Sequence, residues 1–154
     1  MSAAIARAAR RVVLAGAVGA TCDIVYAIVF AGWRGRPAEW LLQVVASGLL
    51  RKAAFQGGWP AAWLGLALHY GIVIVAAALF YAVSRRWAWL REEPVTAGLT
   101  YGVAIYLFMN FVVLPLSAFP FPLRFSLVAT STGLLVHMAG VGLPIALITR
   151  RAHP

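Results

Sequence analysis

The chain has 154 residues, of which 63% are hydrophobic and 11% are charged, and it carries a net charge of +9. A soluble domain of this length would be about half apolar and about a quarter charged, so the composition excludes an ordinary soluble protein. The single cysteine, Cys22, excludes an intrachain disulfide and a CxxC metal or redox site. All Lys and Arg residues lie between or beside apolar stretches, so we expect the lipid bilayer, and no nucleic acid, as their partner.

Four apolar stretches are long enough to cross a membrane, because about 20 helical residues span the hydrocarbon core of a bilayer. We expect spans at about 12–32, 61–84, 95–116 and 126–149, in a single transmembrane domain over residues 1–154. The first span follows a short basic segment, as a signal peptide does. Its apolar run continues to Phe30, however, which is too long for a cleaved signal, so we expect it to be retained. Pro144 should distort the last span.

Residues 38–55 carry a helical pattern of a different kind. Glu39, Gln43, Ser47 and Arg51 recur every four residues, opposite leucine and valine side chains. A polar stripe at this spacing is typical of an amphipathic helix that lies in the membrane interface. The sequence therefore predicts an all-α fold, a polytopic transmembrane four-helix bundle with an additional interfacial helix between spans one and two.

The basic residues favour one orientation of this bundle. The side that holds both termini and the connection after the second span carries eight arginines: Arg7, Arg10, Arg11, Arg85, Arg86, Arg91, Arg150 and Arg151. The opposite side carries five basic residues: Arg34, Arg36, Arg51, Lys52 and Arg124. Because positively charged connections remain on the cytoplasmic side, we expect both termini to be cytoplasmic.

Each span contains one strongly polar side chain at a similar depth, namely Asp23, His69, Asn110 and His137. With a rise of about 1.5 Å per residue, these side chains lie roughly 9 to 17 Å below the outer boundary. A charged side chain at the centre of a span costs about 2.5 to 3.5 kcal/mol on insertion scales, so Asp23 should face a polar partner inside the bundle. Candidate supporting side chains in the same slab are Tyr26, Tyr70, Tyr106, Met109, Met138, Ser131 and Thr132.

This polar layer has a structural interpretation as well as a functional one. Asn110 and the two histidines can hydrogen-bond to neighbouring helices and do nothing more, and the methionines can simply fill gaps in the core. Gly98 and Gly102 form a GxxxG motif, which predicts close helix packing either within the chain or between two copies.

The leading interpretation of function is a small non-enzymatic integral membrane protein, an accessory or assembly subunit or scaffold that binds other membrane subunits or a second copy. An alternative is a minimal transporter or a proton- or cation-conducting bundle that uses the Asp, His and Asn layer. A second alternative is a protein that binds haem b between His69 and His137, or a metal ion with Asp23 as a further ligand. An enzyme is the weaker interpretation, because the chain contains no HExxH or GxSxG motif.

Three parts of the chain together resemble small four-span bacterial inner-membrane proteins of unknown function. They are the stretch LLQVVASGLL at 41–50 with the glycines at 57–58, the pair His69-Tyr70, and the stretch from Met109-Asn110 to Pro115-Leu116-Ser117. This resemblance covers nearly the whole chain. It implies an integral protein of the bacterial cytoplasmic membrane, without an established activity.

Overall fold

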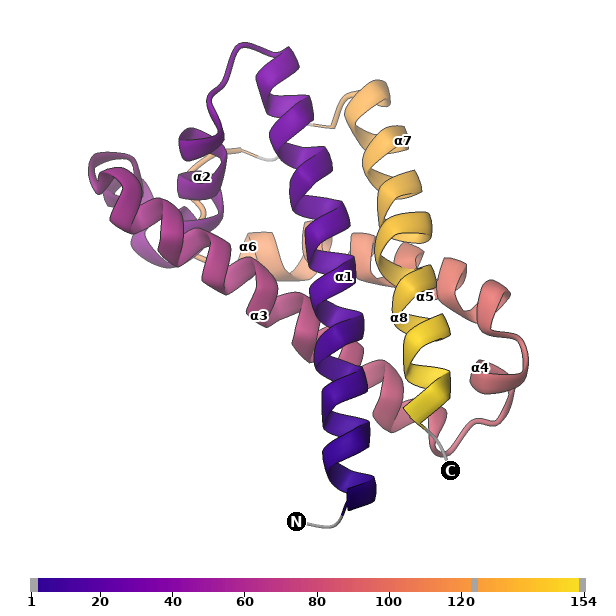
Figure 1. Cartoon of the computed structure of the whole chain (residues 1–154). Helices are drawn as coiled ribbons and strands as arrows, with labels where there is room; N and C mark the ends of the chain where they lie inside the picture. Colours follow the sequence, from indigo (N-terminus) through magenta and orange to yellow (C-terminus); the bar gives the residue numbers. More distant parts are fainter. Residues whose placement is uncertain (1–2, 123–124, 153–154) are drawn as a thin grey trace.

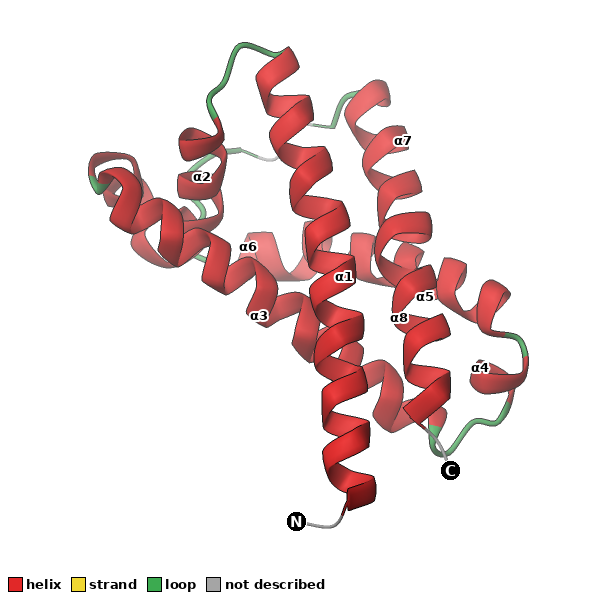
Figure 2. Ribbon diagram, viewed as in Figure 1, coloured by secondary structure: helices red, strands yellow, loops and turns green. Residues whose placement is uncertain are grey.

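The computed structural model describes residues 3–122 and 125–152, and within these ranges it contains helices, turns and loops but no strand (Figure 2). Four helical stretches are long and apolar enough to cross a membrane: Ala3–Trp33, Gly58–Ser84, Pro94–Leu116 and Leu127–Ala152. The expected all-α class and the four candidate spans are therefore confirmed. Arg124, which the sequence analysis assigned to the outer side, lies outside the described residues.

The first helix, α1 (Ala3–Trp33), begins well before the predicted span. Residues 3–11 consist mostly of alanine and arginine, which are strong helix formers, so the helix continues into the basic segment. Its carboxyl end is a Schellman motif, in which the Arg36 N–H donates to the Ala31 carbonyl at 2.9 Å. Gly35 takes the left-handed conformation that this motif requires, with φ of 74°.

The second helix, α2 (Ala38–Leu50), continues into a 3₁₀ turn, Arg51–Gln56, and is followed by α3 (Gly58–Ser84). α2 packs along the first part of α3 (Figure 1). A β-carbon on Gly65 would lie 1.9 Å from the Leu42 carbonyl oxygen. The backbones of α2 and α3 therefore touch at a point where only glycine fits.

The polar stripe of α2 is partly buried, which differs from the interpretation drawn from the sequence. Gln43 and Ser47 are buried, at 6% and 0% exposure, instead of facing headgroups. Gln43 donates to the Gly58 carbonyl at 3.1 Å and to the Glu39 carboxylate at 3.2 Å, and Arg51 is the exposed member of the stripe. A polar side chain is tolerated in a protein interior when its hydrogen bonds are satisfied, so this part of the stripe can face α3.

The short helix α4 (Trp89–Glu92) connects α3 to α5 (Pro94–Phe108). The third candidate span contains α5, the π-helical turn Met109–Val113 and α6 (Leu114–Leu116). The fourth contains α7 (Leu127–Val136), the π-helical turn His137–Gly142 and α8 (Leu143–Thr149), and ends in the 3₁₀ turn Arg150–Ala152.

A proline follows each π-helical turn. Pro115 and Pro144 are the second residues of α6 and α8. Proline lacks a backbone N–H and crowds the preceding turn, which favours a local departure from α-helical hydrogen bonding. The distortion that the sequence predicts near Pro144 thus takes the form of a π-helical turn, in which the helix continues with wider spacing.

The α1 helix and the fourth candidate span lie side by side, and α3 and α5 are inclined to them (Figure 1). α1 packs on both α3 and α8, and α5 packs on α8 and on the π-helical turn His137–Gly142. Small residues line these contacts: Ala15, Ala20, Ala77, Ala97 and Ala146 are all almost fully buried. Small side chains let helices approach closely where lipid provides no hydrophobic driving force.

The GxxxG motif of α5 is used for contacts inside the chain. A β-carbon on Gly98 would lie 2.7 Å from the Cα of Leu143, and one on Gly102 would lie 2.2 Å from the His137 carbonyl oxygen. Both glycines therefore accept the backbone of the fourth candidate span. The sequence left open whether the GxxxG motif packs within the chain or between two copies. In the structure both glycines pack within the chain, against the fourth candidate span.

Candidate functional site

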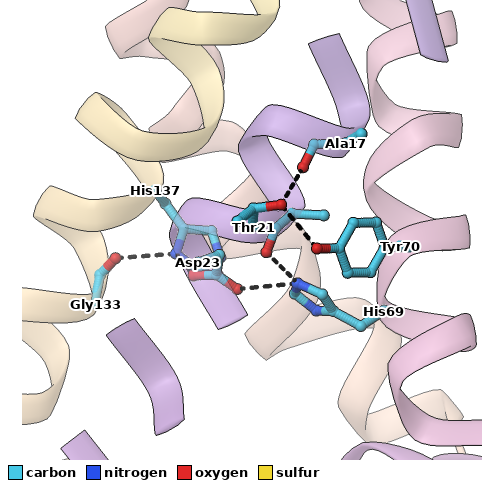
Figure 3. A network of polar contacts seen from close by, with 8 residues as sticks. Ala17, Thr21, Asp23, His69, Tyr70, Gly133 and His137 are labelled. Carbon is cyan, nitrogen blue, oxygen red and sulfur yellow. Dashed lines mark hydrogen bonds and ion pairs between the residues drawn. The ribbon is translucent and has the colours of Figure 1, made fainter. Parts of the chain in front are cut away.

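The Asp23 carboxylate lies between two imidazoles. Its Oδ1 atom is 3.4 Å from Nδ1 of His137, and its Oδ2 atom is 3.9 Å from Nε2 of His69 (Figure 3). The three side chains are 13% to 17% exposed. Asp23 comes from α1, His69 from α3 and His137 from the first residue of the π-helical turn His137–Gly142. The fold thus gathers three ionisable groups from three candidate spans, and we call them the Asp23 cluster.

Backbone carbonyls determine which ring nitrogens carry hydrogen. Nε2 of His69 lies 3.0 Å from the Ala20 carbonyl oxygen, and Nδ1 of His137 lies 2.9 Å from the Gly133 carbonyl oxygen. A carbonyl oxygen only accepts hydrogen bonds, so each of these nitrogens carries a hydrogen. These are also the nitrogens nearest the carboxylate. When the rings are neutral, the other nitrogen of each imidazole holds a lone pair and can accept a proton.

Two hydroxyl pairs flank the Asp23 cluster. The Thr21 and Tyr70 hydroxyl oxygens are 2.7 Å apart, and Thr21 also donates to the Ala17 carbonyl at 2.8 Å (Figure 3). Because the Thr21 hydrogen is used in that bond, Tyr70 is the donor in the pair. The second pair joins the hydroxyls of Tyr26 and Thr132. Sequence reasoning missed Thr21, since a threonine that bonds to its own helix gives no signal of a further partner.

The ring of Tyr106 contacts the edge of His137, with ring centroids 5.3 Å apart and an angle of 82° between the planes. Tyr106 is 9% exposed, so it covers the imidazole from the side of α5. Asn110 donates to the Tyr106 carbonyl at 2.9 Å, one turn back in its own helical stretch. The hydrogen bond of Asn110 is therefore local, and it does not link this side chain to Asp23.

The other supporting residues expected from the sequence lie around this centre. Met109 and Met138 are half-buried in the two π-helical turns. Ser131 is exposed and donates to the Val128 carbonyl within α7. Their positions give them a packing or local role, and the carboxylate and the two imidazoles form the chemical centre.

The π-helical turn that begins at His137 was not expected from the sequence. Glycines on this turn bring it close to both of its neighbours: a β-carbon on Gly140 would lie 3.1 Å from the Cβ of Cys22, the residue before Asp23. π-helical turns often occur at functional sites, because the extra residue re-aims neighbouring side chains. Here the turn directs His137 towards α1.

The space between the three side chains of the Asp23 cluster does not suit a metal ion. Within residues 3–122 and 125–152, no group of three or more His, Cys, Asp or Glu could hold a metal ion. The ring nitrogens nearest Asp23 carry hydrogens that are bonded to carbonyl groups, so they offer no lone pair there. The haem alternative stays an expectation from the sequence, because it would use the other two ring nitrogens, Nδ1 of His69 and Nε2 of His137.

Comparison with family models, curated proteins and solved structures finds no match to this chain. The resemblance to small four-span bacterial membrane proteins therefore stays an expectation.

Proposed function

We propose that this protein binds and releases a proton at the Asp23 cluster, as the centre of a minimal proton-coupled transporter or proton-conducting bundle. The observation that carries this proposal is one carboxylate beside two imidazoles from different candidate spans. Ionisable groups are costly inside a membrane, and those that persist commonly mark ion pathways and proton relays. Imidazole is the side chain that changes charge most readily near neutral pH.

The cluster has the groups that proton binding needs. An incoming proton can be accepted by the lone-pair nitrogen of either imidazole, and the resulting positive charge is balanced by the adjacent carboxylate. The carbonyl groups of Ala20 and Gly133 hold the rings in place during this change. The cluster also joins helices that pack by backbone contact, so a change of its charge alters the attraction between α1, α3 and the fourth candidate span.

The flanking hydroxyls extend the polar centre along α1. Thr21 precedes Asp23 and Tyr26 follows it, at about 3 and 4.5 Å along the helix axis. Each hydroxyl can donate and accept at the same time, which is the property that proton relays use. In this proposal the Thr21–Tyr70 pair relays protons on one side of the cluster, and the Tyr26–Thr132 pair relays them on the other.

For the setting, we propose a four-helix bundle in the bacterial cytoplasmic membrane, as one transmembrane domain with both termini cytoplasmic. The start of α1 and the last described turn of the chain support a common side, because Ala4 and Ala152 line the same groove. Exposed tryptophans occur near the ends of the candidate spans, as at membrane interfaces: Trp33, Trp59, Trp87 and Trp89. We place α2 in the interface, with Leu49 towards lipid, since that side chain is 61% exposed.

A second candidate function is an accessory or assembly subunit that binds other membrane subunits or a second copy. One observation favours it: among the described residues, no buried side-chain nitrogen or oxygen lacks a hydrogen-bond partner. A fully satisfied polar cluster stabilises a unique helix arrangement without any further activity. In that case the Asp23 cluster is a clamp between helices.

Proton flux into liposomes separates these two functions. The purified protein is reconstituted into vesicles that contain a pH-sensitive dye, and a potassium gradient with valinomycin drives proton entry. We expect the wild type to acidify the interior faster than protein-free vesicles do, and Asp23→Asn to remove this difference. Glu92→Gln is the matched control, because it removes an exposed carboxylate outside the cluster and should leave the flux unchanged.

His69→Leu and His137→Leu complete the test. Under the proton-binding proposal, each variant inserts and folds normally but loses the flux. Wild-type vesicles that acidify no faster than protein-free ones would reject the proposal, as would a normal flux in Asp23→Asn. The accessory-subunit function predicts no flux in any variant and only a modest loss of thermal stability.

A further inference from the structure

A basic groove lies at the end of the molecule where α1 begins and the described chain ends. Its volume is about 730 Å³, and it is lined by α1, by the end of α3 and by the turn Arg150–Ala152. Five arginines line it: Arg7, Arg10, Arg11, Arg85 and Arg151. We call this feature the arginine groove. It lies apart from the Asp23 cluster, which is further along α1.

The charges of the arginine groove are not neutralised within the described part of the chain. The described residues that line it include no Asp or Glu. The ion-pair contacts found in residues 3–122 and 125–152 join Asp23 to the two histidines, and none involves these guanidinium groups. Guanidinium stays protonated throughout the physiological pH range, so the groove gathers five positive charges that repel one another. A bound anion would remove this repulsion.

Only some of the arginines in this region line the groove. Arg91 is adjacent in space to the end of α3, where it donates to the Ser84 carbonyl. Arg86 and Arg150 are sequence neighbours of Arg85 and Arg151, yet they do not line the groove. The groove is therefore a defined set of side chains from three separate elements within a basic surface.

Apolar side chains continue the groove towards the bilayer. Leu14 lines the groove one helical turn after Arg10 and Arg11, and it is 45% exposed. The groove is also lined by apolar residues nearer the start of α1, on the side away from the predicted span: Ala4, Ile5 and Ala8. A groove with guanidinium groups and an apolar wall matches a molecule that has a phosphate group attached to hydrocarbon. Inorganic phosphate has no hydrocarbon that could contact that wall.

We propose that the arginine groove binds the headgroup of an anionic phospholipid, with an acyl chain against Leu14. The planar guanidinium group pairs with two phosphate oxygens at once, which makes arginine well suited to phosphodiesters. Five cations exceed the charge of a single phosphodiester, so the groove prefers a lipid with two, such as cardiolipin. Basic pockets between transmembrane helices on the cytoplasmic side are known to bind such headgroups. This inference is independent of the proton-binding proposal.

Two double variants with the same change of charge test the proposal. Arg85→Gln/Arg151→Gln removes two groove residues, and Arg86→Gln/Arg150→Gln removes their sequence neighbours, which are not part of the groove lining. Binding of cardiolipin, phosphatidylglycerol and phosphatidylcholine to the purified full-length protein in detergent is measured by native mass spectrometry. With about a five-fold loss for each arginine, the groove variant should bind cardiolipin about 25-fold more weakly than the wild type. The neighbour variant should lose less than about five-fold.

Comparison of the three lipids, and competition by inorganic phosphate, distinguish a specific lipid site from diffuse surface charge and from a free-anion site. We expect cardiolipin to bind more tightly than phosphatidylglycerol, and phosphatidylcholine to bind weakly to every variant. Equal losses in the two double variants would overturn the proposal, because diffuse surface charge would then explain binding. Displacement of cardiolipin by an equal concentration of inorganic phosphate would show a free-anion site instead of a lipid site. If Arg85→Gln/Arg151→Gln fails to fold, Arg7→Gln/Arg10→Gln on the exposed start of α1 replaces it, with the same expected loss.

Discussion

The backbone of Gly102 in α5 lies directly against the backbone of His137: a β-carbon at position 102 would come within 2.2 Å of the His137 carbonyl oxygen. The same β-carbon would lie 2.5 Å from the Cα of Met138. The position of the His137 imidazole beside Asp23 therefore depends on a glycine in a different candidate span. The GxxxG motif and the polar cluster, which look unrelated in the sequence, form one structural unit.

The first prediction is that Gly102→Ala both destabilises the protein and disturbs the Asp23 cluster. The new methyl group meets backbone atoms, which cannot rotate away, so α5 must move from the π-helical turn His137–Gly142. Overpacking of this kind typically costs about 1 to 3 kcal/mol. Thermal unfolding in detergent measures the loss. In the proton-flux assay, Gly102→Ala should show a reduced rate.

Gly32→Ala provides the control for this variant. Gly32 is also in a helix, and nothing lies within 4 Å of a β-carbon at that position. Alanine is a better helix former than glycine, so Gly32→Ala should be neutral or slightly stabilising. Equal stability of the two variants would contradict the close contact between Gly102 and His137.

The second prediction concerns the coupling between Asp23 and His137. In a double-mutant cycle with Asp23→Asn and His137→Leu, we expect a coupling energy above about 0.6 kcal/mol, the average for interhelical polar contacts in membrane proteins, and up to about 1.7 kcal/mol, the largest such value. The cause is the 3.4 Å approach of the carboxylate to Nδ1. The measurement is the free energy of unfolding in detergent of the wild type, the two single variants and the double variant.

Asn110 supplies the comparison for this cycle. Its hydrogen bond is to the Tyr106 carbonyl in its own helical stretch, so Asp23→Asn and Asn110→Leu should be additive within about 0.5 kcal/mol. A strong coupling to Asn110, with none to His137, would mean that the polar layer is arranged differently in the membrane.

The third prediction is that Gly65→Ala displaces α2 from α3. A β-carbon there would lie 1.9 Å from the Leu42 carbonyl oxygen, so the helices have to separate. Residues 38–56 should then exchange their amide hydrogens faster and become sensitive to protease. Gly71→Ala tests the same substitution in the same helix, at a position where a β-carbon meets nothing within 4 Å. Equal hydrogen-exchange protection of α2 in the two variants would argue against the contact.

The fourth prediction concerns topology. In a Cys22→Ala background, single cysteines at Arg7 and Ala152 should react with an impermeant thiol reagent from the cytoplasmic side, because both residues line the arginine groove. A cysteine at Arg36, beyond the carboxyl end of α1, should react from the opposite side. Labelling of positions 7 and 152 from opposite faces of the membrane would rule out the proposed four-span topology.

The number and approximate position of the four candidate spans were accessible from the sequence, because membrane crossing depends on the length and hydrophobicity of a continuous segment. The inward orientation of Asp23 also followed from local chemistry, since lipid offers a carboxylate no partner. Neither property depends on how the helices are rotated or where they cross.

The set of residues that forms the site depends on how the helices are rotated and where they cross, so only the tertiary structure decided it. Similar depth placed Asn110 with Asp23, His69 and His137 in the sequence, yet Asn110 bonds within its own helical stretch. The polar stripe of α2 has the period of an interfacial helix, but contact with α3 at Gly65 buries part of it. The arginine groove unites residues from the two ends of the chain and the end of α3, which no local pattern connects. Helix periodicity specifies which side chains share a face, and only the packing of one helix on another specifies what that face meets.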